Sequence, residues 1–203
     1  MAQNFEWYQI INSNKEITQG DILEDILIMT SIETESPPYY KSVGFPSDVI
    51  VMTQACDIQQ GKVEYINLCR LLPLDELIVK HVIKNSNDQA TANITTCGDL
   101  VSGQRKIGGK FVESLIQGNI VNYYLLENND ILKNRVVDVS ESFKMPIKSL
   151  YKTISDLEDR DRLRLQPPYR EHLAQHYANT FGRIGLPFNL NRDEIFRRYN
   201  LTK

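Results

Sequence analysis

The chain lacks any long hydrophobic run. No apolar stretch among its 203 residues approaches the roughly 20 residues that a membrane-spanning helix needs. The N-terminal segment, Met1 to Asn14, is polar and lacks the basic-then-apolar layout of a signal peptide. We therefore expect a cytoplasmic protein without a membrane partner.

Cysteine is also scarce, with three residues at Cys56, Cys69 and Cys97 and no CxxC pair. An odd number of unpaired cysteines argues against a disulfide framework and is typical of reduced thiols. The chain is 41% hydrophobic and 24% charged. This composition excludes wholesale disorder and a coiled-coil repeat, and the length suits one globular domain with its own core.

The charge is distributed unevenly. Residues 1–149 carry 13 Lys and Arg against 19 Asp and Glu, whereas residues 150–203 carry 10 against 7, most of the ten being arginines from Arg160 onward. A basic end on an acidic body can bind nucleic acid, an acidic partner or the body itself.

The pattern of apolar residues predicts an α+β fold with a small antiparallel, barrel-like sheet and a helical C-terminal part. We expect one domain over 1–203, in which residues 1–72 and 120–140 are β-rich, residues 74–118 form a helical or loop insert, and residues 146–203 are helical. Strands are expected at 22–29, 48–53, 63–72, 120–126 and 135–139. Helices are expected at 74–85, 110–117, 147–154, 169–184 and 192–199, with a polar loop over 85–109 and a solvated connection over 156–164.

The helix that begins at Tyr169 carries two stripes. Leu173 and the residues one turn apart from it form an apolar stripe, and His172, His176, Asn179 and Arg183 form a polar one beside it. Two interpretations are open. The polar stripe is either the wall of a binding site, with Arg170 nearby, or a flank that hydrogen-bonds to neighbouring strands.

The H-x3-H spacing of His172 and His176 can bring two imidazoles to one Zn²⁺. The HExxH pattern, however, needs Glu where Leu173 stands, and HxxEH needs Glu where Gln175 stands. A third ligand would have to come from Cys56, Asp57 or Glu171. We expect no metal and no cofactor.

A second group of candidates follows the buried strand that ends near Thr53. Polar side chains emerge where a strand leaves the core, so Thr53, Gln54 and Asp57 are candidate binding residues. Cys56 and Asp57, with a histidine such as His172, are candidates for catalysis. Because the Asp57 carboxylate opposes formation of a thiolate, we expect Cys56 to be a buried structural cysteine instead.

Two segments resemble a family of uncharacterised bacterial proteins of about this length. The segments GDILEDI and VIVMTQACDI, and later LRLQPPYREHLAQHYANTFGRIGLP, are similar to its (S/T)QxCD(I/L) strand end and its C-terminal PYREHLxQ…RxGLP helix. The resemblance implies no established activity. It implies a mobile or defence-related gene neighbourhood and a partner protein from the same gene cluster.

The leading strands also resemble the small, SH3-like barrel of the MazF/PemK toxins, which cleave RNA. Those toxins place an Arg after the second strand and a Thr or Ser at the end of the next. Here the two stretches read TQACDIQQG and INLCRLLPL, which contain neither feature at the matching positions. This resemblance implies the barrel and not the toxin active site.

Three functions are compatible with these observations. The first is a non-enzymatic binding or adaptor module that contacts a partner protein or nucleic acid. The second is a MazF/PemK-like ribonuclease or another phosphodiester-acting enzyme, with His172 as acid or base. The third is a structural subunit of a complex, in which a homo-oligomer would bury the polar helix stripe.

Overall fold

The computed structural model describes residues 6–86, 94–129, 131–156, 160–182 and 198. It is an α+β fold, as the sequence predicts. Its strands are β1 (Tyr8–Ile11), β2 (Ile22–Glu33), β3 (Tyr40–Val51), β4 (Tyr65–Pro73), β5 (Tyr123–Leu126), β6 (Arg135–Pro146) and β7 (Arg162–Leu165). Its helices are α1 (Ala55–Gln59), α2 (Leu74–Asn85), the 3₁₀ turn η2 (Cys97–Asp99), α3 (Ser102–Ile116), α4 (Ile147–Asp156) and α5 (Tyr169–Phe181). The helix expected at 192–199 lies outside the described residues, except for Arg198.

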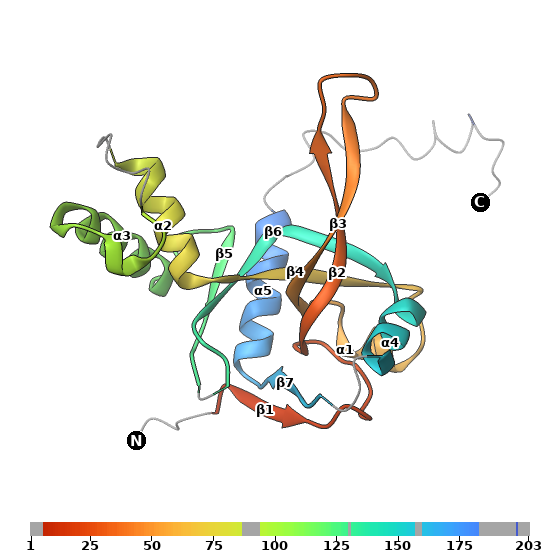
Figure 1. Cartoon of the computed structure of the whole chain (residues 1–203). Helices are drawn as coiled ribbons and strands as arrows, with labels where there is room; N and C mark the ends of the chain where they lie inside the picture. Colours follow the sequence, from red (N-terminus) through yellow and green to blue (C-terminus); the bar gives the residue numbers. More distant parts are fainter. Residues whose placement is uncertain (1–5, 87–93, 130, 157–159, 183–197, 199–203) are drawn as a thin grey trace.

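The main sheet has five antiparallel strands in the order β2-β3-β4-β6-β5. It is an open sheet with β2 and β5 at its two edges, so the expected closure into a barrel is wrong. Two irregularities in register, between Leu23 and Ile26 and between Cys69 and Arg70, bend the strands locally. The β2–β3 hairpin continues beyond the sheet and projects from the body (Figure 1).

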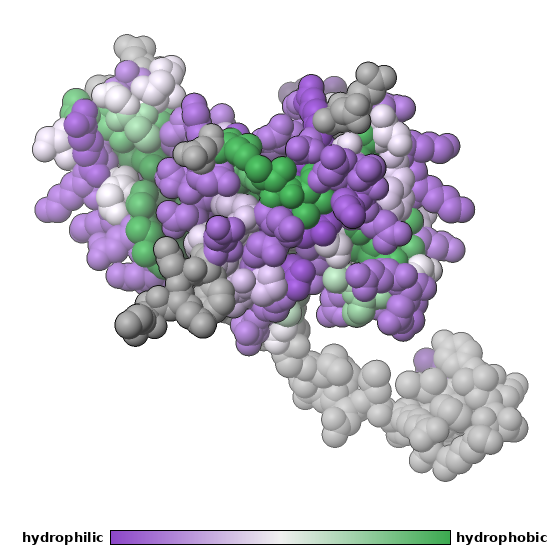
Figure 2. Space-filling model, turned by 90° about the horizontal axis from the view of Figure 1, so that it is seen from below, coloured by the Kyte–Doolittle hydropathy of each residue, from purple (hydrophilic) through white to green (hydrophobic). Residues whose placement is uncertain are grey.

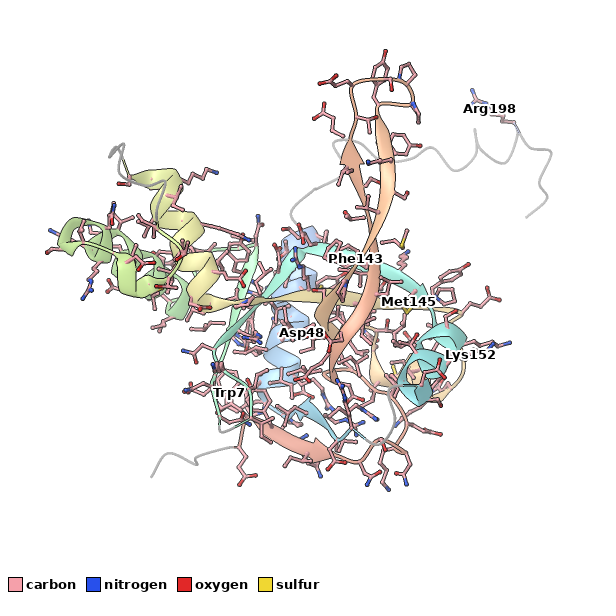
Figure 3. All side chains as sticks on the ribbon, viewed as in Figure 1. Trp7, Asp48, Phe143, Met145, Lys152 and Arg198 are labelled. Carbon is pink, nitrogen blue, oxygen red and sulfur yellow. The ribbon has the colours of Figure 1, made fainter. Side chains whose placement is uncertain are left out.

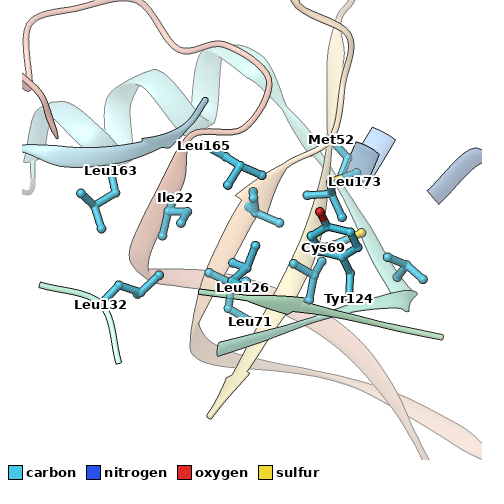
Figure 4. Packing of buried hydrophobic residues seen from close by; sticks show 13 residues of the cluster. Ile22, Met52, Cys69, Leu71, Tyr124, Leu126, Leu132, Leu163, Leu165 and Leu173 are labelled. Carbon is cyan, nitrogen blue, oxygen red and sulfur yellow. The ribbon is translucent and has the colours of Figure 1, made fainter. Parts of the chain in front are cut away.

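Helix α5 covers one face of the sheet. Its Leu173 is 1% exposed and packs against Cys69 and Leu71 of β4 and Tyr124 of β5 (Figure 4). Successive side chains of a strand point to opposite faces, so Cys69 and Leu71 of β4 face α5 while Ile66 and Leu68 face the other side. This packing fixes the rotation of α5 and therefore the direction of its polar stripe.

The opposite face is covered in two parts. Near one end, Leu150 of α4 and Ile58 of α1 pack on Ile66 and Leu68 of β4. Near the other end, helices α2 and α3 form a separate lobe, in which Phe111 and Leu115 meet the end of β4 (Figure 1). The lobe occupies the segment expected to be an insert, and α3 begins eight residues earlier than the expected helix at 110–117.

Strands β1 and β7 pair with each other, from Tyr8 opposite Leu165 to Ile11 opposite Arg162. The connection expected over 156–164 is therefore wrong at its C-terminal end, where the RLRL sequence forms a strand. No helix in the described part of the chain is both long and apolar enough to cross a membrane.

A candidate binding groove

A groove of about 760 Å³ separates the α2–α3 lobe from the body of the molecule. Viewed from below, apolar residues gather in a band on the side of the lobe, surrounded by hydrophilic surface (Figure 2). The walls come from Trp7, the end of α3, β5 with the turn after it, and α5. The lining residues are Trp7, Leu74, Val112, Leu115, Ile116, Gln117, Gly118, Tyr123, Tyr124, Leu125, Leu126, Glu127, Asn128, Asn134, Tyr169, His172 and His176.

His172 is held in the groove by Tyr124. The Tyr124 hydroxyl lies 3.0 Å from Nδ1 of His172, and the two rings meet edge to face. Burial raises the pKa of Tyr124 to about 12, so the phenol keeps its proton at neutral pH and can donate it to Nδ1. Nε2 of His172 forms no hydrogen bond with the described residues. The contact with Tyr124 therefore orients an imidazole whose second nitrogen can hydrogen-bond to a ligand.

His176 lies one turn further along α5 and has a different role. Its Nε2 donates to the carbonyl of Val121 at 2.8 Å, and the Thr180 hydroxyl donates to the same carbonyl at 3.3 Å. Both bonds tie α5 to the segment that leads into β5. The polar stripe of this helix thus combines the two interpretations, with His172 facing the groove and His176 anchoring the helix.

Two stacked aromatic rings form one end of the groove. Trp7 lies beside the start of β1 (Figure 3), and its ring stacks on that of Tyr169 at 3.8 Å between centroids and 11° between planes. Nearby, the Tyr8 hydroxyl donates to the carbonyl of Glu127 at 2.6 Å. These contacts hold the N-terminal segment against the turn that follows β5.

The strand-end candidates lie elsewhere. Thr53 is buried, and its hydroxyl oxygen accepts a hydrogen bond from the amide of Asn67, so it closes the end of β3. The thiol of Cys56 lies 3.7 Å from Oε1 of Gln54 and 3.8 Å from Oδ1 of Asp57, at the start of the short helix α1. None of these four residues lines the groove. Cys56 is exposed, so the expected burial of this thiol is wrong, and Cys69 is the buried cysteine.

The arginines of the C-terminal part pair with carboxylates of the same chain. Arg170 pairs with its neighbour Glu171, and Arg160 pairs with Asp25 at 3.6 Å. Arg162 and Arg164 both contact the carboxylate of Asp21. Arg183 lies outside the described residues. Arg160, Arg162 and Arg164 therefore contact carboxylates of the acidic body, whereas Arg170 pairs within α5.

Three segments that carry the bacterial resemblance meet at Gly20 and Asp21. The amide of Gly20 donates to the carbonyl of Val51, and the amide of Val51 donates to the carbonyl of Asp21. The amide of Leu165 donates to the carbonyl of Gly20. Gly20 has φ of +86°, and a Cβ there would lie 3.1 Å from the Leu165 carbonyl oxygen and 3.2 Å from the Arg170 side chain. The GDILEDI, VIVMTQACDI and LRLQPPY segments therefore form a structural junction.

The residues of the groove favour binding over covalent chemistry. Its lining includes no Ser, Thr, Cys, Lys or Arg, so it offers no aliphatic hydroxyl or thiol nucleophile, and its basic groups are the imidazoles of His172 and His176. In the described part of the chain, no three His, Cys, Asp or Glu side chains lie close enough to share a metal ion. Among the described residues, no third ligand joins His172 and His176, as a zinc site would require.

Two other hollows are less suited to a ligand. The first, near Ile22 and Leu163, has about 70 Å³, room for only a few water molecules. The second, about 660 Å³ between Ser13–Ile17 and the end of α4, is shallow and polar. Neither contains a candidate from the sequence.

Sequence reasoning missed Trp7, Tyr124 and Tyr169 as groove residues. In the sequence alone, these aromatic residues are typical of a hydrophobic core. Trp7 and Tyr124 lie far from His172 in sequence, and the arrangement of the strands brings them to the same groove. No family model matches the chain, and no curated protein matches it either.

Proposed function

We propose that this protein is a non-enzymatic cytoplasmic adaptor module that binds an extended segment of a partner protein in the groove. The observation that carries the proposal is the lining, in which aliphatic and aromatic side chains predominate, a smaller number of polar groups such as His172 and Asn128 lie among them, and lysine and arginine are absent. Sites that bury apolar groups and fix them with a few polar contacts have this composition.

The unpaired edge of β5 supports an extended ligand. β5 lies at the edge of the sheet, and β6 is the one strand that pairs with it in the described structure. Residues Tyr123–Leu126 all line the groove. An added strand would form main-chain hydrogen bonds along such an edge, and its alternate side chains would occupy the apolar walls.

Two exposed groups would become buried on binding. Ile116, at the end of α3, is 69% exposed and lines the groove, so it is available as an apolar contact. Nε2 of His172 would donate to a carbonyl oxygen of the bound segment. The energy of such a site comes from a few well-packed anchors.

The charge of the groove argues for protein over nucleic acid. Binding of nucleic acid depends on lysines and arginines that neutralise phosphates. The arginines next to the lining residues Asn134 and Tyr169 are Arg135 and Arg170, and they are engaged with Asp48 and Glu171. Glu127 and two histidines are the titratable groups in the lining besides the tyrosines.

The test is selection of a random peptide library displayed on phage against the purified protein. Enriched peptides are synthesised, labelled and titrated by fluorescence anisotropy against three proteins: the original chain, Ile116→Glu and Val101→Glu. Val101 lies at the other end of α3, is 58% exposed and does not line the groove. We expect Ile116→Glu to weaken binding by about tenfold or more, because it places a charge in the apolar wall, and Val101→Glu to leave it unchanged.

A parallel gel incubates the protein with labelled single-stranded RNA and DNA, with and without Mg²⁺. No retardation and no cleavage are expected. Cleavage that is lost in His172→Ala would replace the proposal with the enzyme, and salt-sensitive retardation would replace it with a nucleic-acid module. Peptides that bind Ile116→Glu as well as the original chain would also overturn it.

A further inference from the structure

The far end of the β2–β3 hairpin presents a second exposed surface, which the rest of the described chain does not cover. Its strands pair from Ile26 opposite Ser47 to Glu33 opposite Tyr40. The near end is anchored, since Ile26 and Ile28 are buried in the core. We call residues 27–46 the arm. Its base packs on the body through Ile28 and Phe45, and its far end extends beyond the body with no helix or other described strand beside it (Figures 1 and 3).

One face of the arm is apolar. Leu27 and Met29 are 58% and 57% exposed and share this face with their cross-strand partners Pro46 and Gly44. A Cβ on Gly44 would lie 3.0 Å from Sδ of Met29 and 3.3 Å from Cδ1 of Leu27, so both side chains lie against the glycine. Further toward the tip, this face carries Ser31 opposite Ser42 and then Glu33 opposite Tyr40, which is 57% exposed.

The arm also has a free edge. Along residues 26–33, β3 is the one described strand that pairs with β2. The irregularity between Leu23 and Ile26 lies at the base, and the register beyond it is regular. Native sheets normally cover or disrupt such an edge, because it presents unpaired backbone groups to other strands.

The tip is ordered and does not fold back over the apolar face. The amide of Thr34 donates to the carbonyl of Tyr39 at 3.0 Å, and the amide of Tyr39 donates to the carbonyl of Ser36 at 2.8 Å. These bonds close the hairpin turn on itself. The tip therefore leaves Leu27 and Met29 of the apolar face exposed.

Acidic residues flank the apolar stretch of β2 at both ends. Glu24 lies before it, Glu33 and Glu35 lie after it, all three are exposed, and none forms an ion pair with a described lysine or arginine. Pairing with β2 of a second copy would bring acidic ends together in either direction. A strand with basic ends would instead complement them.

We propose that the arm binds an extended strand of another protein, with alternating apolar residues flanked by Lys or Arg, through the free edge of β2. The arm and the groove lie on different elements, so this inference does not depend on the proposed function. Together the two surfaces would let one copy of the chain join two protein segments.

The probes are two short fluorescein-labelled peptides of alternating Thr and Val. One has two lysines at each end, and the other has glutamates in their place. The proteins are the original chain, a Leu27→Ser/Met29→Ser variant, a Glu33→Lys/Glu35→Lys variant and Ile83→Ser, which removes an exposed apolar side chain on α2. All the substituted residues are exposed, and circular dichroism confirms that each variant folds.

We expect the lysine-flanked peptide to bind the original chain and Ile83→Ser equally. Its affinity should fall about tenfold or more in Leu27→Ser/Met29→Ser, because apolar contact area is lost. In Glu33→Lys/Glu35→Lys the preference should shift toward the glutamate-flanked peptide. Binding of the Ile116→Glu groove variant should match the original chain.

Four results would overturn the inference. The first is equal binding of both peptides to the original chain, and the second is equal affinity of the lysine-flanked peptide for the original chain and Leu27→Ser/Met29→Ser. The third is a dimer in sedimentation that Leu27→Ser/Met29→Ser dissociates, which would make a second copy the occupant of the arm. The fourth is failure of the lysine-flanked peptide to bind the original chain at millimolar concentration.

Discussion

The carboxylate of Asp21 accepts a hydrogen bond from Nε of Arg162 at 2.8 Å, although 141 residues separate the two in sequence. Asp21 is fully buried, and Arg164 contacts its other oxygen. The guanidinium of Arg162 also donates to the backbone carbonyls of Lys15 and Glu16, so the buried ion pair is hydrogen-bonded to the loop before β2 as well. The network joins the start of β2, the loop before it and β7.

Asp21→Asn should destabilise the protein by about 3–5 kcal/mol, because it leaves two arginines in the interior without their counter-charge. The matched control is Asp25→Asn. Asp25 pairs with Arg160 at 3.6 Å, both side chains are more than half exposed, and such a pair contributes about 0–1 kcal/mol. Urea unfolding of the three proteins measures the difference. Equal losses in both variants would contradict the structural importance of the buried network.

Two adjacent glycines of α3 should respond in opposite directions to alanine. Gly109 has open space around it, so Gly109→Ala should stabilise the protein by about 0.5–1 kcal/mol through helix propensity. At Gly108 a Cβ would lie 3.0 Å from Cγ2 of Ile78 on α2, so Gly108→Ala forces the helices apart and should destabilise. Thermal unfolding measures both. A stabilising Gly108→Ala would show that the two helices do not pack this closely.

Alkaline pH should weaken the fold through Tyr124. Burial raises the pKa of Tyr124 to about 12, above its ordinary value of 10.0. Because the folded state holds this proton more tightly than the unfolded state, its contribution to stability is complete below pH 10 and is lost as the pH rises toward 12. Tyr124→Phe should lose less stability over this interval than the original chain. Tyr39→Phe, at an exposed position, is the control, and identical pH profiles for Tyr124→Phe and the original chain would contradict the assignment.

The three thiols should react with a disulfide reagent in a fixed order. Cys56 is exposed and should react first, whereas burial raises the pKa of Cys97 and should slow it. Cys69 is fully buried, and burial raises its pKa to about 12, so it should react after unfolding. Stopped-flow absorbance resolves the phases, and Cys56→Ser should remove the fastest one. A fast phase that survives in Cys56→Ser would show that another thiol is accessible.

The elements with strong local patterns were predictable. Helix α2 begins and ends where its apolar spacing predicts, at Leu74 and Asn85, and α4 and α5 begin at the expected residues. These segments carry their own boundary signals, such as the proline before Tyr169. Strand β2 was predicted only as far as Met29, because its distal half is too polar to read as a core strand.

The segments that depend on distant partners were not predictable. The RLRL sequence of β7 reads as a charged connection because Asp21, which neutralises both of its arginines, lies far away in sequence. The first half of α3 contains glycines, which are unfavourable in helices and so did not predict one. Gly108 is among them, and it lies close to Ile78 of α2. In the groove, the helical spacing placed His172 and His176 on one face, but their partners Tyr124 and Val121 depend on the order of strands in the sheet.

The pairing of β1 with β7 has a consequence for synthesis. Tyr8 lies opposite Leu165, so β1, which is synthesised early, can pair only after β7 has been synthesised. At about 5–20 residues per second, the interval is on the order of ten seconds. During this time the β2–β3 hairpin can form from local contacts, but Asp21 has no counter-charge. Nascent chains that stall before Arg162 should therefore be cleaved by added protease at the start of β2, where the released chain is protected.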